Sequence, residues 1–301
     1  MKMKSKSLLL VSMLGSLTLA ACGGGGGGDS STPTAQSASA PASASAPASA
    51  SAPATASAPA AASAPALTGE ALPSLTSPQA GSTAAAGNGS EGLWTQSGTS
   101  NMTAFVDPAN NLSYLNGLFS IVTATFFGTI STATSNWTLT TGFETVGGFR
   151  YTAASGSGTI AANQTLTGSY VANGSTVNLA LTYDPANALA VTQSSVAGTW
   201  AQTSTTITVD NAGGFTGSIL GCGVTGTLAL TTAGSNKNLY TMTLTGTAST
   251  CSLRSGVTYS GNAAIKFVPV TGSTTLYKRT VVYLIKAADN LEIAYGQLTK
   301  Q

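Results

Sequence analysis

Hydrophobic and polar residues alternate with a period of two along several stretches of residues 93–301. The alternation runs through residues 137–143 and 257–267, and it places one set of side chains on each face of a strand. In a third stretch, the residues that share the apolar face are Val177, Leu179, Leu181 and Tyr183. Because one face is apolar and the other polar, these stripes predict antiparallel sheets with one buried and one solvated face.

Glycine and threonine recur through the same region. A glycine followed by Ser or Thr and then an apolar residue occurs at Gly128, Gly158, Gly168, Gly217 and Gly226, which is typical of short strands with regular bends. We therefore expect an all-β fold in which meanders close into barrels or sandwiches of about seven or eight strands per lobe. Closure would remove exposed sheet edges, and charged residues that could protect such edges make up only 7% of the chain.

A repeat divides this region into two lobes. The segment GTWAQT at 198–203 repeats the pattern of GLWTQS at 92–97. Each copy is followed by a Thr-rich strand pattern and by a turn that begins at an aspartate, Asp107 or Asp210. The repeat predicts two related antiparallel lobes, at 92–192 and 193–301, each of ordinary domain length.

Residues 22–91 precede the lobes and have the composition of a disordered linker. Six consecutive glycines occupy positions 23–28, and five hexads rich in Ala, Ser and Pro follow at 37–66. Such a sequence has no apolar face to bury, and its regularly spaced prolines interrupt helices. We interpret it as a tether.

The first 21 residues have the pattern of an export signal. Three lysines within the first six residues form a basic segment, and residues 8–19 form an apolar segment too short to span a bilayer. The apolar segment ends in the tetrapeptide LAAC at 19–22, which resembles the lipobox of bacterial lipoproteins.

The lipobox resemblance implies that residues 1–21 are removed as a signal peptide and that Cys22 carries diacylglycerol on its sulfur and an acyl group on its new N-terminus. Two or three acyl chains anchor a protein stably in a membrane. Glycine follows the cysteine where aspartate would imply retention at the inner membrane, so this class of signal implies delivery to the outer membrane. The alternative is an ordinary secretory signal in which Cys22 is incidental.

The segment PAAASAP at 59–65 resembles the Ala-, Ser- and Pro-rich acceptor segments of O-glycosylation systems of Gram-negative bacteria. This resemblance implies a glycan on Ser63. The other hexads present serines in nearly the same context, so the position within the tract stays open.

Charge and composition exclude several classes of function. The chain has 11 Lys and Arg against 9 Asp and Glu, too few basic residues for a nucleic-acid-binding face. It has no His, which excludes Ser-His-Asp and Cys-His centres and histidine metal sites. Most acids of the lobes begin turns, and the exceptions, Glu144 and Glu292, lie in different lobes, although a glycosidase needs two converging carboxylates. We therefore expect no enzyme activity, no metal site and no cofactor.

Two cysteines remain once Cys22 is assigned to lipid. Cys222 and Cys251 form an even pair in an oxidising compartment, which predicts a disulfide. If residues 221–230 pair antiparallel with 239–246, the chain returns to bring the two cysteines together. Reactive or metal-binding thiols are the alternative.

Two clusters combine aromatic and basic residues. Arg150, the first lobe's only basic residue, lies beside Phe143, Phe149 and Tyr151, and an arginine beside aromatics can hold a carboxylate or a sugar ring. The second cluster, residues 277–279, precedes an apolar run at 281–285. The alternative for both is core aromatics beside a basic residue at a strand end. Another apolar run, at 118–130, either lines a barrel interior or faces a partner.

The lipobox, the low-complexity tether and the paired Gly- and Thr-rich lobes resemble, in architecture, transferrin-binding-protein-like surface lipoproteins. The segment GGFTGSI at 213–219 carries this likeness, whereas the handle domains of that family are missing. We expect a lipid-anchored outer-membrane lipoprotein, facing the periplasm or the surface, that presents a β-rich module to a protein or small-molecule partner. The alternative is a lipocalin-like carrier with a hollow lined by Phe126, Phe143 and Tyr151.

Overall fold

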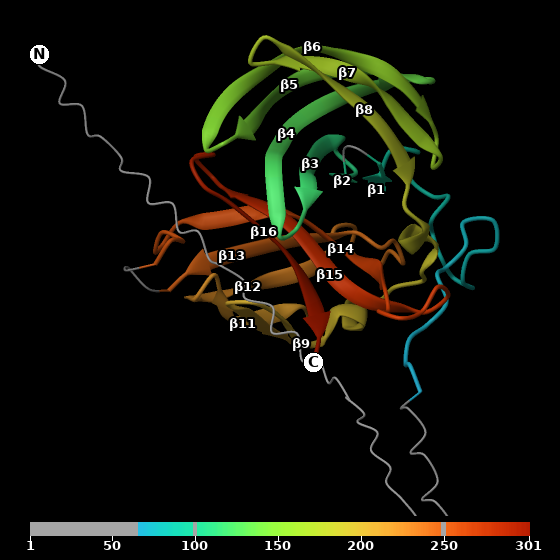
Figure 1. Cartoon of the computed structure of the whole chain (residues 1–301), viewed down its shortest axis with the longest axis vertical. Coiled ribbons are helices and arrows are strands. Elements are labelled where there is room, and N and C mark those ends of the chain that lie inside the picture. Colours follow the sequence, from blue (N-terminus) through green and yellow to red (C-terminus); the bar gives the residue numbers. More distant parts are fainter. Residues whose placement is uncertain (1–65, 99–100, 248–250) are drawn as a thin grey trace, which may run out of the picture. The chain divides into compact units, whose positions relative to one another are not determined.

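The computed structural model of the protein describes residues 66–98, 101–247 and 251–301. These residues form two closed barrels, each built from eight antiparallel strands (Figure 1). The all-β fold with two lobes that the alternation predicts is confirmed, and so is the number of strands per lobe. The signal peptide, Cys22 and Ser63 lie outside the described residues.

The strands of the first barrel follow one another as a meander. They are β1 (Gly92–Gln96), β2 (Met102–Val106), β3 (Asn111–Leu118), β4 (Ile121–Ala133), β5 (Asn136–Val146), β6 (Phe149–Ala161), β7 (Thr165–Ala172) and β8 (Ser175–Tyr183). Pairing of β1 with β8 closes the barrel, with Trp94 opposite Tyr183.

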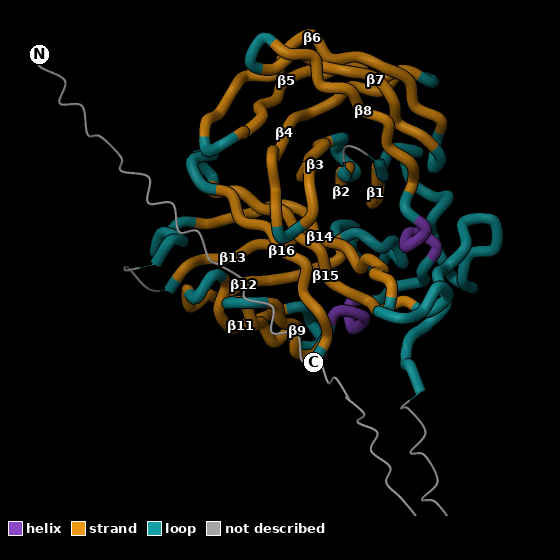
Figure 2. Tube along the Cα trace, in the orientation of Figure 1, coloured by secondary structure: helices purple, strands orange, loops and turns teal. Residues whose placement is uncertain are grey.

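The second barrel repeats this order. Its strands are β9 (Gly198–Gln202), β10 (Thr205–Val209), β11 (Gly214–Ile219), β12 (Cys222–Leu230), β13 (Tyr240–Gly246), β14 (Thr258–Pro269), β15 (Tyr277–Ala287) and β16 (Ile293–Lys300). Pairing of β16 with β9 closes it. Two short 3-10 helices, η1 (Pro185–Ala188) and η2 (Gln193–Val196), lie in the connection between the barrels (Figure 2). No helix in the described part of the chain has the length and hydropathy to cross a membrane.

Equivalent positions make equivalent contacts in the two barrels. The indole nitrogens of Trp94 and Trp200 each donate to the backbone carbonyl four residues earlier, at 2.7 Å. Asp107 and Asp210 each accept hydrogen bonds from the backbone nitrogens two and four residues later, which fixes the predicted turns. The two lobes therefore share local structure as well as sequence pattern.

Aromatic side chains fill the first barrel. The Phe126 ring lies between Tyr114 and Tyr170, with centroid separations of 5.2 and 4.8 Å. Glycine is required beside it, because a Cβ on Gly128 would come within 2.6 Å of the Phe126 ring. The alternation of bulky and minimal residues thus produces a packed interior.

The strand β15 is buried on both faces. Tyr283 lies on one face, and the alternation puts Val282 and Leu284 on the other. These residues share one hydrophobic cluster with Phe105 and Phe127 of the first barrel, and we call this contact between the barrels the seam. Burial on both faces explains why residues 281–285 form an unbroken apolar run.

Residues 66–91, which we call the strap, were predicted to belong to a disordered linker, but they contact both barrels. Backbone groups of Glu70 pair with Tyr277, and its carboxylate binds the Arg279 guanidinium through two bonds of 2.6 and 2.8 Å. Farther along, Ala84 is buried and its carbonyl accepts from Tyr183. The strap is held by backbone pairing and single polar contacts, so its composition did not reveal it. The predicted start of the folded part at residue 92 is wrong.

The two cysteines require a second correction. The predicted strand pairing is confirmed, since Val224 of β12 lies opposite Gly246 of β13 and Leu230 lies opposite Tyr240. This pairing brings Cys222 and Cys251 to a separation of 2.8 Å. That separation exceeds the ~2.05 Å of an S–S bond, and both residues are free thiols. Each sulfur instead lies near polar groups, Cys222 at Ser252 and Cys251 at the Gly221 carbonyl. The predicted disulfide is not formed.

Deletion of the strap should destabilise the barrels. Glu91 is the carboxylate partner of Lys237, whose side chain is 4% exposed, and removing one member of a buried ion pair costs about 3–5 kcal/mol. We expect the fragment 92–301 to lose at least that much free energy of unfolding relative to the fragment 66–301, measured by urea titration.

The matched control is removal of residues 23–65 from the mature chain, which should leave the urea midpoint unchanged. Equal midpoints for the fragments 92–301 and 66–301 would show that the strap contributes no stability.

Candidate ligand-binding grooves at the seam

Two hollows open beside the seam. The larger, of about 880 Å³, takes residues from both barrels and from the strap, including Met102, Phe267 and Leu72. We call it the lysine cleft. The smaller, of about 610 Å³, lies between β3, β4 and β5 of the first barrel and β13, β14 and β15 of the second. We call it the aromatic groove, and both volumes lie in the range of small-molecule sites.

Two phenylalanines of the first barrel form the aromatic side of the groove. The rings of Phe127 and Phe143 stack with centroids 5.6 Å apart. Cationic side chains approach both rings, with Lys286 Nζ 5.7 Å from the Phe127 centroid and Arg150 Cζ 5.3 Å from that of Phe143. The groove thus combines apolar faces with positive charge.

One residue holds both of these cations. The Arg150 guanidinium donates to the Asn290 carbonyl at 3.3 Å, and the Lys286 ammonium donates to the Asn290 side-chain oxygen. Burial lowers the pKa of Lys286. Among the described residues, ion pairs are found for Lys237, Arg254, Lys266 and Arg279 but not for Arg150 or Lys286.

The predicted cluster of Phe143, Phe149, Arg150 and Tyr151 is divided between two faces of the sheet. Phe143 lines the aromatic groove, and Arg150, whose guanidinium lies over the Phe143 ring, lines the hollow beside it. Tyr151 packs against the interior cluster of the first barrel, and Phe149 is 69% exposed at the start of β6. Adjacent residues on a strand face opposite ways, so proximity in sequence brought together only half of the cluster.

In the second basic cluster, residues 277–279, one of the two basic residues has a structural role. Arg279 binds Glu70 of the strap, and its guanidinium lies 5.9 Å from the Phe267 ring centroid. Lys278 is exposed. The apolar run 118–130 is also divided, because Phe126 fills the first barrel while Phe127 lies at the seam.

A half-buried lysine lies in the lysine cleft. Lys266 donates to the Thr103 hydroxyl at 3.0 Å and lies 3.9 Å from the Asp184 carboxylate. Burial lowers the pKa of this amine, and Asp184 opposes the change. The Asp184 carboxylate also caps η1 by accepting a hydrogen bond from the Ala186 nitrogen. The Lys266 amine therefore contacts a carboxylate that already has a structural role.

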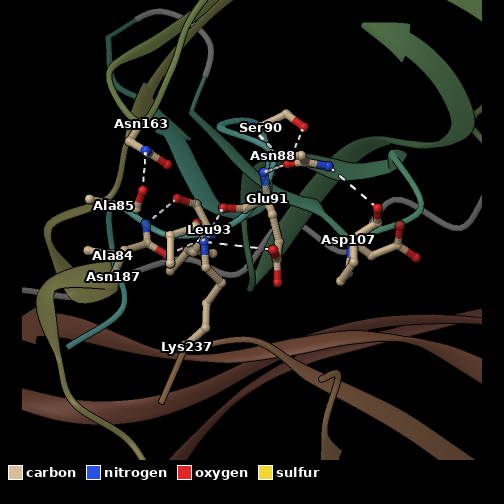
Figure 3. A network of polar contacts seen from close by, with 12 residues as sticks. Ala84, Ala85, Asn88, Ser90, Glu91, Leu93, Asp107, Asn163, Asn187 and Lys237 are labelled. Carbon is tan, nitrogen blue, oxygen red and sulfur yellow. Dashed lines mark hydrogen bonds and ion pairs between the residues drawn. The ribbon is translucent and has the colours of Figure 1, made fainter. Parts of the chain in front are cut away.

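A fully buried lysine joins the second barrel to the strap (Figure 3). Lys237 donates to the carbonyl oxygens of Ala86 and Glu91 and lies 3.8 Å from the Glu91 carboxylate. Burial lowers the pKa of Lys237 and raises that of Glu91, and the attraction between them opposes both changes. This pair is enclosed by strap backbone, so we assign it to structure.

The two carboxylates that lie outside turns do not converge. Glu144 accepts hydrogen bonds from Tyr114 and Tyr170 inside the first barrel. Glu292 binds Arg254 and Tyr259 in the second barrel. Within the described residues, no group of three or more potential metal ligands is found.

Three residues of the grooves were missed by sequence reasoning. Lys286 and Asn290 follow the second apolar run, and Lys266 lies on the polar face of a strand. Alternation alone could have placed Lys266 and Lys286 on outward faces of β14 and β15. It could not show that a second barrel covers those faces.

No family model, curated protein or solved structure matches this chain.

Alkaline pH should destabilise the barrels because of their buried tyrosines. Burial raises the pKa of Tyr114, Tyr170, Tyr183, Tyr240 and Tyr283. Tyrosines of the unfolded chain lose their protons near pH 10, while these five keep theirs. The native state then binds more protons, so the free energy of unfolding falls as pH rises above about 10.

The variant Tyr283→Phe tests this directly. The Tyr283 hydroxyl is buried without a hydrogen-bond partner among the described residues, so its removal should not destabilise the protein at pH 7. Urea titrations at pH 8 and pH 11 should show a smaller loss of stability in the variant. An unchanged loss would contradict the assignment.

Proposed function

We propose that this protein is a lipid-anchored lipoprotein of the outer membrane that presents its two barrels as a binding module. The basic segment, apolar segment and lipobox of residues 1–22 support the anchor. The glycine run and the Ala-, Ser- and Pro-rich hexads support a tether that spaces the module from the membrane. A glycan on Ser63 is part of the same proposal.

The observation that carries the binding function is that both hollows at the seam are composite. The lysine cleft and the aromatic groove each take residues from both barrels. A ligand site at a domain interface is a common arrangement. The partner is a small molecule or a protein segment that fits these hollows, and the module acts by binding it rather than by catalysis.

The carrier alternative needs a hollow inside a barrel. Of the three residues expected to line it, Phe126 is fully buried between two tyrosines. Phe143 lies at the aromatic groove outside the barrel, and Tyr151 packs against the interior. The three therefore do not share one surface, and the geometry supports binding at the seam better.

Replacement of Cys22 tests the anchor. Cys22→Ala removes the sulfur that would carry lipid, so the variant should leave the membrane fraction and appear in the soluble fraction. The wild-type chain should also incorporate a clickable fatty acid, detected on a gel. Complete retention of Cys22→Ala in the outer-membrane fraction would contradict lipid anchoring.

Ser12→Ala is the matched control, because it changes the apolar segment of the signal without touching the lipobox. It should leave fractionation and labelling unchanged. Protease treatment of intact cells, followed by detection of the barrels, then shows on which side of the outer membrane the module lies.

A further inference from the structure

Arg150 and Lys286 come from different barrels and converge on Asn290. Both are bonded to this one residue. A neutral asparagine satisfies their hydrogen bonds without compensating their charge. Arg150 is exposed and Lys286 is half-buried, and two like charges held at one residue repel each other.

Two carboxylates of the surrounding turns are already engaged. Asp289 binds the Arg254 guanidinium at 2.8 Å. Asp107 lines the aromatic groove, but its oxygens accept hydrogen bonds from Ala109 and Asn111 of its own turn. An external anion would therefore supply the negative charge that no described residue provides to Arg150 and Lys286.

The walls of the groove suit hydroxyl-rich molecules. Nine of its lining residues carry a hydroxyl or a side-chain amide: Asn111, Ser113, Thr129, Thr141, Thr241, Thr258, Ser260, Asn262 and Asn290. The buried hydroxyl of Ser113 has no hydrogen-bond partner among the described residues. A buried hydroxyl without a partner is unfavourable unless a ligand or water supplies one.

Arg150 extends the site beyond the aromatic groove. It lines a neighbouring hollow of about 340 Å³ together with Thr145 and Leu291, and Asn290 lines both hollows. A molecule that spans the two can place one anionic group at Asn290 and lay its remainder along Phe127 and Phe143. Planar guanidinium recognition of a carboxylate fits this position.

We propose that the aromatic groove binds an acidic saccharide, with its carboxylate held by Arg150 and Lys286 and its sugar ring against Phe127 and Phe143. This inference deepens the proposed binding function and depends on it. It does not depend on the lipid anchor, because every residue that it uses belongs to the barrels.

Calorimetric titration of the purified full chain tests the proposal. The probes are an oligoglucuronate, an oligoglucose of the same length, and inorganic phosphate. We expect saturable binding of oligoglucuronate and at least about tenfold weaker binding of the other two. Oligoglucose lacks the carboxylate that makes charged hydrogen bonds, and phosphate lacks the sugar ring that contacts the aromatic side chains.

Variants locate the site. Arg150→Gln and Lys286→Gln should each weaken oligoglucuronate binding about tenfold or more. Lys278→Gln and Lys300→Gln remove the same charge from exposed positions outside the aromatic groove and should leave the affinity within about twofold, as expected for surface charges. Phe143→Ala should weaken saccharide binding, and circular dichroism checks that each variant is folded.

Several results would overturn the proposal. These are the absence of saturable oligoglucuronate binding, equal affinity for oligoglucose, equal affinity for phosphate, or equal losses in the control variants. None of them bears on the fractionation of Cys22→Ala. Conversely, a protein that is soluble without lipid can still bind the saccharide, so the two proposals fail separately.

Discussion

The contact between the two barrels is the constraint on which the other features depend. The strand β15 contributes Tyr283 to the interior of the second barrel and Val282 and Leu284 to the seam. Without the first barrel, these two apolar side chains would face water, at a cost of about 1.5–3 kcal/mol for each fully buried side chain. Barrel closure provides hydrogen-bond partners for the backbone groups of the strands in each barrel. Only the seam covers the outer face of β15.

Both candidate sites exist because of this contact. The lysine cleft and the aromatic groove each take lining residues from both barrels. Arg150 of the first barrel and Lys286 of the second meet at Asn290 only when the seam is closed. The strap reinforces it, since its Glu91 carboxylate lies beside Lys237 and its Glu70 binds Arg279 of the second barrel. The proposed binding and the stability of the barrels therefore depend on the same surface.

The sequence predicted those features of the fold that depend on local residue patterns. Alternation identified several of the strands, and the repeated Trp94 and Trp200 segments identified the two lobes. The antiparallel pairing of residues 221–230 with 239–246, on which the cysteine prediction depended, is present. Contacts between distant segments were not predictable, because the strap is fixed by backbone pairing and by Glu70, which no periodicity marks. The candidate site was half predicted. Phe143 of the predicted cluster lines the groove and Arg150 lies beside it. Phe127, Lys286 and Asn290 join them through a seam that the strand pattern does not encode.

Hydrogen exchange as a function of urea, read by mass spectrometry on peptides from each barrel, tests the seam most directly. If the seam makes the barrels one cooperative unit, peptides from β5–β7 and from β10–β13 should lose protection at the same urea concentration with the same dependence on urea. Loss of protection in the first barrel while the second remains fully protected would show that the barrels are independent, and would contradict the account.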